Sequence, residues 1–194
     1  MIRVIAPIAG FAPANLPPDP VSTNFSTGCV VLVQECDIWY ERPSSARLCV
    51  MAATTVAIAA DHAGYQLKEI LKRQLEDLGY GVLDLGTDGP DSVDYADFGQ
   101  AVAEALVAQQ AAYGVALCGT GIGISIAANR HRQVRAALCH DAFTARMSRQ
   151  HNDANVLAMG ARVIGEEVAK DCLREFLATN FEGGRHDRRV AKLS

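Results

Sequence analysis

Between residues 56 and 178, short apolar runs alternate with longer segments in which apolar residues recur every three or four positions. The short runs predict buried β-strands, and the longer segments predict amphipathic α-helices. The first helical segment is the clearest, because its apolar residues share one face and Gly79 follows as a C-terminal glycine. The predicted strands cover residues 56–60, 81–85, 115–118, 134–139 and a fifth strand region, 156–159 with 161–164. The predicted helices cover residues 66–78, 96–110, 122–129, 141–149 and 166–178.

This alternation predicts a parallel β-sheet covered by helices on both faces. In sheets of this kind, ligands bind at the carboxyl ends of the strands. Polar residues follow several of the predicted strands, and a further polar stretch ends the fourth predicted helix. We therefore expect one site built from Asp61 and His62, Asp94 and Tyr95, Cys118, His140 and Asp141, residues 149–153, and Arg162.

Residues 1–50 differ in character from the rest of the chain. They hold six of the seven prolines and contain no helical period longer than one turn. Three interpretations stay open: a disordered or loosely docked extension, a targeting peptide, or a segment that precedes the true start. We favour the third, because Met51 leads directly into the first clean strand. The predicted working domain then covers residues 51–194.

Composition narrows the classes of function. The 194-residue chain is 49% hydrophobic, which suits a well-buried domain, and its net charge of −4 does not indicate a basic nucleic-acid surface. No apolar run approaches the length of a membrane span. The six cysteines include no Cys-x-x-Cys pair, so we expect neither a zinc site nor a disulfide scaffold. Reduced thiols in a cytoplasm are the simpler interpretation.

The candidate chemistry centres on residues 118–125, Cys-Gly-Thr-Gly-Ile-Gly-Ile-Ser, directly after the third predicted strand. Glycines between a strand and a helix place backbone N–H groups at a helix N-terminus, where they bind anionic oxygen. The Gly-x-Gly-x-Gly spacing excludes a dinucleotide fingerprint, and Ile124 after Gly123 excludes a Walker loop. The same helix end favours the thiolate of Cys118, which is the reactive form. A tight structural connection stays open as the plain alternative.

Four motifs lie in order along the chain: Asp61-His-Ala-Gly64, Cys118-Gly-Thr-Gly-Ile-Gly-Ile-Ser-Ile-Ala-Ala-Asn129, Ser148-Arg-Gln-His-Asn-Asp153 and Glu182-Gly-Gly-Arg-His186. Together they closely resemble the type B ribose-5-phosphate isomerases, with the related galactose-6-phosphate isomerase subunits in the same superfamily. The resemblance runs from about residue 56 to the C-terminus. It implies a three-layer, Rossmann-like α/β/α sandwich on a five-stranded parallel sheet, and no metal or organic cofactor. It also implies a homodimer, sometimes a tetramer, with active sites across the subunit interface.

By this resemblance the substrate is a sugar phosphate, and the reaction interconverts ribose 5-phosphate and ribulose 5-phosphate in the pentose phosphate pathway through a cis-enediolate. Cys118 is the implied base that moves a proton between C2 and C1, and His151 is the implied acid/base that opens the furanose ring. Thr120 is expected to relay protons between O1 and O2, to orient one of them, or to cap the helix. The backbone N–H groups expected to hold the enediolate oxygen are those of residues 119–123, including Gly119, Gly121, Ile122 and Gly123.

The remaining implied residues bind the sugar and its phosphate. Asp61 and Asn152 are expected to contact the sugar, although Asp61 is equally suited to cap the helix that follows it. Tyr95 is expected in the pocket wall. Arginine forks match phosphate geometry, and the implied phosphate clamp consists of His62, Arg162, Arg185 and Arg189. A solvated basic tail is the alternative for the last two, and part of the clamp is expected from the partner chain.

Three other functions stay open from the sequence. The same chemistry on allose 6-phosphate or galactose 6-phosphate differs only in pocket size. A non-catalytic, regulatory sugar-phosphate-binding domain would have little need for Cys118 and His151 together. A thiol redox sensor would need a resolving cysteine, and none lies near Cys118 in the sequence.

Overall fold

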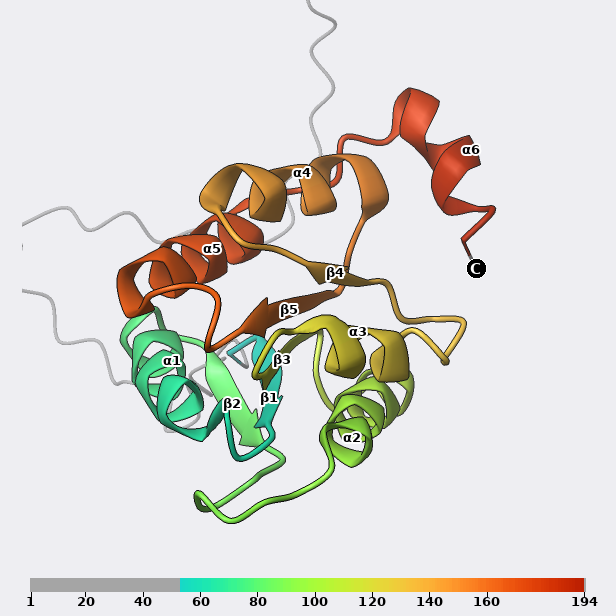
Figure 1. Ribbon diagram of the computed structural model, residues 1–194. Coiled ribbons are helices and arrows are strands. Elements are labelled where there is room, and N and C mark those ends of the chain that lie inside the picture. The colour runs from blue at the N-terminus through green and yellow to red at the C-terminus, as the bar shows by residue number, and fades with distance from the viewer. Residues whose placement is uncertain (1–52, 194) are drawn as a thin grey trace, which may run out of the picture. The chain divides into compact units, whose positions relative to one another are not determined.

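The computed structural model describes residues 53–193, and at their centre lies a parallel sheet with the strand order β2-β1-β3-β5-β4 (Figure 1). Each neighbouring pair of these strands is parallel. The strands are β1 (Thr55–Ala60), β2 (Gly81–Asp84), β3 (Tyr113–Cys118), β4 (Ala136–Leu138) and β5 (Val156–Gly160). The helices are α1 (Tyr65–Asp77), α2 (Tyr95–Val107), α3 (Ile122–Ala128), α4 (Ala142–Asn152), α5 (Glu166–Ala178), the 3-10 turn η1 (Gly184–His186) and α6 (Asp187–Val190).

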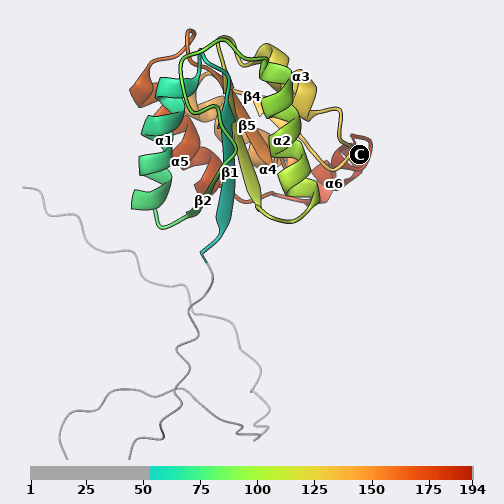
Figure 2. The ribbon, with the colours of Figure 1, turned by 90° about the horizontal axis from the view of Figure 1, so that it is seen from below.

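The helices form two layers on opposite faces of the sheet, with α1, α4 and α5 on one face and α2 and α3 on the other (Figures 1 and 2). The alternation of side chains along β1 shows how one strand serves both layers. Val56, Ile58 and Ala60 join the first hydrophobic layer, whereas Ala57 and Ala59 face the other side. The predicted three-layer sandwich on a five-stranded parallel sheet is therefore confirmed.

A buried ion pair joins α1 to the last residue of β2. The Lys68 side chain is fully buried, and its Nζ donates to the two Asp84 carboxylate oxygens at 2.7 and 2.9 Å. Burial raises the pKa of Asp84, but hydrogen bonds from Lys68, Lys72 and the Gly86 N–H outweigh it, so the pKa lies below its ordinary value. Either charge without its partner would destabilise the folded protein at this depth. The pair therefore holds α1 against the sheet.

The ends of several elements differ from the sequence prediction. β5 ends at Gly160, and residues 161–164 form a turn because the N–H groups of Val163 and Ile164 donate back to the Gly160 carbonyl. The predicted strand at 134–139 shortens to Ala136–Leu138, and the fourth helix continues to Asn152. The basic tail is folded, since η1 and α6 lie within it. The other predicted strands and helices are present, with ends shifted by at most three residues.

None of the described helices has the length and apolar character needed to cross a membrane. The predictions for residues 1–50, and for a start at Met51, fall outside the described residues.

The two ends of the sheet decide where each candidate residue lies. At the amino end Gly114 of β3 pairs with Val156, and at the carboxyl end Cys118 pairs with Gly160. With a rise of about 3.3 Å per residue, these two levels are roughly 13 Å apart along β3. A helix that connects parallel strands runs back from the carboxyl end to the amino end. The last residues of each crossover helix therefore lie at the amino end.

Candidate active site

The loop between β3 and α3 forms the floor of the candidate site. Cys118 is 4% exposed, and its Sγ accepts a hydrogen bond from the Gly121 N–H at 3.0 Å. Gly121 has a φ of 77°, and a Cβ there would lie 2.8 Å from the carbonyl carbon of Met159. Only glycine fits this turn, because both the backbone conformation and the close approach exclude a side chain. This backbone conformation directs the Gly121 N–H toward the Cys118 Sγ.

Two of the loop's N–H groups are therefore engaged within the loop itself. Gly121 donates to Sγ, and Ile122 donates to the Oγ1 of Thr120 at 3.3 Å. The expectation that all of residues 119–123 offer free donors is thus too broad. Gly123 lies in the first turn of α3, where an N–H has no partner in the preceding helical turn, and it lines the pocket.

A cavity of about 430 Å³ opens above this loop. It brings together Asp61, Tyr95 and Cys118 with the loop after Cys118, whereas the other expected strand-end residues, His62, Asp94, His140, Asp141 and Arg162, do not line it. Its lining residues are Asp61, Tyr95, Cys118, Gly119, Thr120, Ile122, Gly123 and Ile126. The aromatic ring of Tyr95 packs on Gly123, where a Cβ would lie 2.7 Å from the ring's Cζ. Tyr95 therefore forms part of the pocket wall.

Asp61 serves the fold and the cavity together. Its Oδ1 accepts hydrogen bonds from the N–H groups of Ala63 and Gly64 at 2.9 and 3.0 Å, just before α1 begins. Both contacts are local, so Asp61 stabilises the turn that leads into α1, whose N-cap, Gly64, forms no side-chain cap hydrogen bond. The same side chain also lines the cavity and is 5% exposed.

His62 and Arg162 flank the loop from two other strand ends. The His62 Nδ1 accepts a hydrogen bond from the Val93 N–H at 3.3 Å, which leaves Nε2 as the protonated nitrogen of the neutral ring. The Arg162 N–H donates to the Gly119 carbonyl at 3.0 Å, and its side chain passes beside Gly119. Both residues thus place donors near the Cys118 loop.

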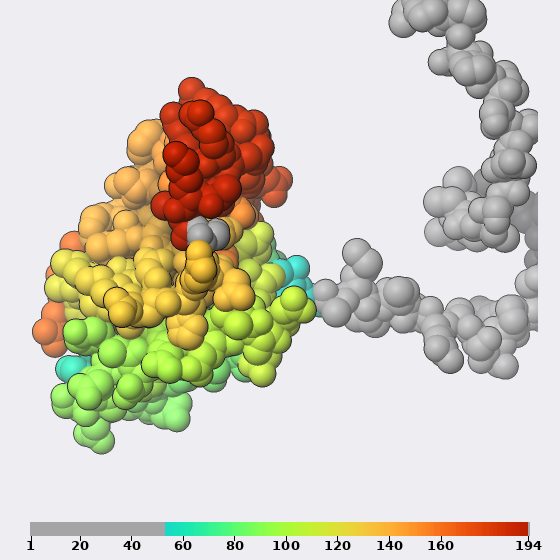
Figure 3. Space-filling view, turned by 90° about the vertical axis from the view of Figure 1, so that its right-hand side faces the viewer, coloured from blue at the N-terminus to red at the C-terminus, as the bar shows by residue number. Residues whose placement is uncertain are grey.

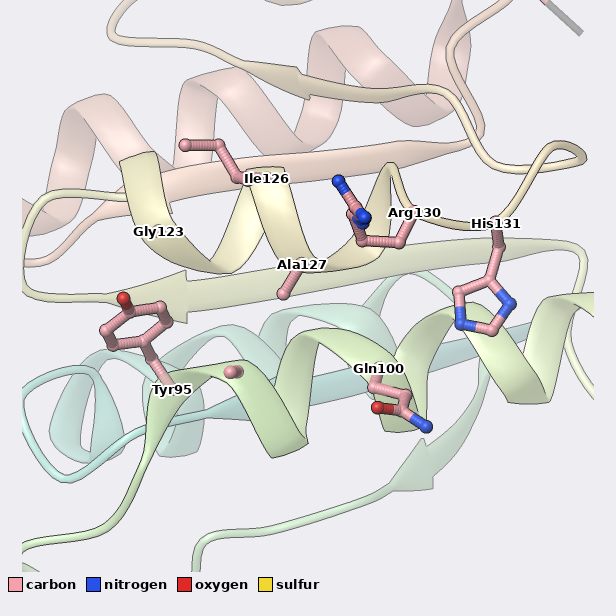
Figure 4. A pocket seen from close by; sticks show the side chains of 8 residues that line it. Tyr95, Gln100, Gly123, Ile126, Ala127, Arg130 and His131 are labelled. Carbon is pink, nitrogen blue, oxygen red and sulfur yellow. The ribbon is translucent and has the colours of Figure 1, made fainter.

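A groove of about 420 Å³ between α2 and α3 adjoins this cavity and shares Tyr95, Gly123 and Ile126 with it. Figure 4 shows Tyr95 and Gly123 at one end of the groove and His131 at the other. The exposed apolar side chains of Ile122 and Ile126 lie on the same helix, one turn apart, at 53% and 60% exposure.

Within one chain, His151 and Asn152 lie away from this cavity. Both are the last residues of α4, and the Asn152 carbonyl accepts from the Arg135 Nε at 3.1 Å, just before β4 begins. They therefore lie at the amino end of the sheet, with Cys118 at the carboxyl end. Sequence reasoning grouped them with the strand ends, although a helix that follows a strand ends on the opposite side.

The predicted clamp residues Arg185 and Arg189 are also distant from Cys118, because their segment packs beside His151. The rings of His151 and His186 are stacked, with centroids 4.4 Å apart and 6° between the planes. Arg185 donates from Nε to the His186 Nε2 at 3.1 Å. Of the four residues predicted for the phosphate, His62 and Arg162 lie by the cavity, whereas Arg185 and Arg189 do not.

Sequence reasoning assigned no role to Glu182 and His186, although both belong to the fourth motif. The Glu182 Oε2 lies 4.0 Å from the His151 Nε2 and 3.8 Å from the His186 Nε2. These three side chains have the donor types of a metal site, with ligand atoms within 4.8 Å of one another. They suit a cation poorly, because Arg185 already occupies the lone pair of the His186 Nε2 and Arg189 adds a second positive charge nearby.

Comparison with known proteins agrees with this fold. The model of the ribose/galactose isomerase family matches residues 56–193. The ribose-5-phosphate isomerase B of Escherichia coli (strain K12) is 42% identical over 139 residues, which cover 72% of this chain and 93% of that protein. The solved ribose-5-phosphate isomerase B of Clostridium thermocellum is 49% identical, with a TM-score of 0.71 over 72% of this chain and 95% of that one. The type B enzyme of Trypanosoma brucei is 40% identical, with a TM-score of 0.71 over 73% and 97% of the two chains.

The fold, the family match and the solved structures together define a sugar-phosphate isomerase. The chain belongs to the ribose/galactose isomerase family, and residues 56–193 carry the match.

Proposed function

We propose that this isomerase interconverts D-ribose 5-phosphate and D-ribulose 5-phosphate, and that two copies of the chain form each active site. One copy supplies the Cys118 cavity at the carboxyl end of its sheet. The other supplies His151, Asn152, Arg185 and Arg189 from the amino end of its own sheet. The observation that carries the two-copy site is the separation of these groups in one chain by the length of β3.

Cys118 is the base in this proposal. Its Sγ takes the proton from C2 of the open-chain sugar, the C2–H electrons form the C1–C2 double bond, and O1 becomes an oxyanion. The proton then returns at C1, so no covalent intermediate forms. The Gly121 N–H donates to this sulfur at 3.0 Å and holds it at the cavity floor. Cys139 and Cys172 are unsuited to this role, because burial raises their pKa to about 11 and about 12.

The loop next to Cys118 handles the two oxygens. Gly123 lines the cavity in the first turn of α3, and in this proposal its N–H donates to the enediolate oxygen. Thr120 is exposed, and its Oγ1 accepts from the Ile122 N–H, so its hydroxyl proton is available to donate. The proton on O2 passes to O1 by way of this hydroxyl, which completes the exchange of aldehyde and ketone.

Ring opening and phosphate binding complete the site. His151 protonates the ring oxygen of the furanose as the C1 hydroxyl loses its proton. His62, through Nε2, and Arg162 approach the phosphate from the first copy, and Arg185 and Arg189 approach from the second. The planar guanidinium groups of arginines suit the phosphate dianion.

The surface that brings two copies together contains the tail, α3 and α2, which share one face of the molecule (Figure 3). Exposed apolar side chains lie on α2 at Tyr95 and on α3 at Ile122 and Ile126. A second copy that covers them would place its amino-end residues over the first copy's cavity. A two-fold dimer of this kind forms two such sites.

The identity of the substrate is tested by kcat/KM for ribose 5-phosphate, allose 6-phosphate and galactose 6-phosphate, measured side by side on the purified protein. The proposal predicts that the pentose phosphate is preferred by at least about tenfold, since an extra carbon would displace the phosphate from its arginines. A tenfold preference for either hexose phosphate would contradict it.

A further inference from the structure

The stacked rings of His151 and His186 differ sharply in their surroundings. His186 is 3% exposed, whereas the His151 side chain is 37% exposed and its ring is open to a ligand. The ring of His186 therefore has a fixed place in the fold. The ring of His151 is held against it on one side.

The hydrogen bonds around His186 set its protonation state. Its Nε2 accepts from the Arg185 Nε, so a neutral His186 carries its proton on Nδ1. Nδ1 is buried without a hydrogen-bond partner among the described residues. Burial lowers the pKa of His186, as do the charges of His151, Arg185 and Arg189, while Glu182 acts in the opposite direction. Its surroundings thus disfavour the protonated form of His186.

We propose that His186 is a positioning residue that fixes the plane of the His151 ring for proton transfer to the sugar. This inference rests on the proposed function, in which His151 opens the furanose ring. A freely rotating imidazole visits the productive orientation only part of the time, and a flat, neutral partner restricts that rotation without competing for the proton.

The segment before His186 holds this partner in place. The Glu182 N–H donates to the Gln150 carbonyl at 3.1 Å, which ties the segment to the last turn of α4. The carboxylate of Glu182 lies beside both imidazoles and supplies a counter-charge when His151 is protonated. On its own helix, His151 is flanked by Arg149 and Asp153, which pair with each other at 2.9 Å.

Two substitutions distinguish the effect of the stacked ring from the effect of its two nitrogens. His186→Phe keeps an aromatic ring for stacking but removes both nitrogens, and His186→Ala removes the ring. Arg188→Ala, on exposed α6, is the matched control for an altered tail. Each variant is examined as the full chain by NMR of labelled histidine, by its thermal midpoint and by its kcat and KM for ribose 5-phosphate.

The proposal predicts that the ring protons of His151 are shifted upfield by the stacked ring in the unaltered protein and in His186→Phe. In His186→Ala this shift is lost, and kcat falls about tenfold while KM changes less than about twofold. His186→Phe keeps most of kcat, and Arg188→Ala keeps all of it.

Unchanged His151 shifts and kcat in His186→Ala would overturn the proposal. So would an equal loss of kcat in His186→Phe that retained the upfield shift and the thermal midpoint. The NMR result does not depend on turnover. A protein whose His151 shows the stacking shift but which does not isomerise ribose 5-phosphate would refute the proposed function and leave the stacked geometry intact.

Discussion

The residues of the proposed active site are divided between the carboxyl and amino ends of the sheet. At the carboxyl end, Cys118 and the loop that follows it are built from backbone donors and a buried thiol. At the amino end, His151 and the arginines of the tail are more exposed side chains gathered around the buried His186. In the proposed mechanism, the first end supplies the base and an oxyanion donor, and the second end supplies the ring-opening acid and two of the phosphate ligands.

The contrast explains why the glycine loop and the tail are so different in composition. A proton-transfer base works best in a fixed, water-poor cavity, which the Gly121 turn and the close packing of Tyr95 on Gly123 provide. A phosphate clamp and a ring-opening acid have to reach a substrate that another surface already holds. We infer that the tail serves this purpose for the neighbouring copy.

The largest effect is expected at the carboxyl end, from Cys118→Ser. The substitution keeps the shape of the side chain but replaces a thiol with a much weaker acid, so kcat for ribose 5-phosphate should fall about a thousandfold. The measurement is steady-state turnover of the purified variant. Cys172→Ser is the control, because that buried thiol should affect the thermal midpoint and leave kcat unchanged. A Cys118→Ser protein with full kcat would remove Cys118 as the base.

A smaller effect is expected at the amino end, from Arg189→Ala. The loss of one charged hydrogen bond to phosphate is worth about 1.5–3 kcal/mol, which corresponds to a rise in KM of about ten- to a hundredfold with little change in kcat. The neighbouring Arg188→Ala should leave KM unaltered. Equal effects of the two substitutions would show that the tail acts only through its net charge.

The smallest effect is a difference in acid sensitivity between the two ends. The pKa of His186 is lowered by burial and by the charges of His151, Arg185 and Arg189. The neutral ring therefore stabilises the folded protein above about pH 6.5, and this contribution is lost as the pH falls below that value. The pKa of Asp84 is also lowered, so the stability from its pair with Lys68 lasts until the pH falls below about 4.

Hydrogen exchange at pH 7 and pH 5, corrected for intrinsic rates, measures this difference. Peptides from residues 182–193 should lose protection at pH 5, while the peptide that contains Asp84 should keep it. In His186→Phe the tail should no longer respond to pH. Equal loss of protection at both ends would contradict the assignment.

The order and type of the elements could be predicted from the sequence because each strand is mostly apolar and the main helices each have one apolar face. The Cys118 loop could be predicted for the same reason, since its glycines follow a buried strand directly. The end of β5 could not, because three of the four residues in the turn at 161–164 are apolar, and the N–H groups of Val163 and Ile164 bond back to Gly160.

The amino-end cluster was harder to predict for a different physical reason. His151 ends a helix, so its place depends on the direction of α4 and not on its distance from a strand in sequence. The burial of His186 depends on how a charged tail folds against α4, and its stacking on His151 leaves no local signal. The Gly121 N–H bond to Sγ likewise requires the left-handed conformation of one glycine, which the spacing of glycines permits but does not specify.

Complementation between two inactive variants tests the two-copy site most directly. Cys118→Ser and His151→Asn chains, carrying different affinity tags, are co-expressed, and the mixed dimer is purified through both tags. In the proposed arrangement the mixed dimer has one intact site of two, so its kcat per dimer should be about half that of the unaltered protein, while each variant alone is nearly inactive. A mixed dimer as inactive as its parents would show that Cys118 and His151 have to belong to the same chain.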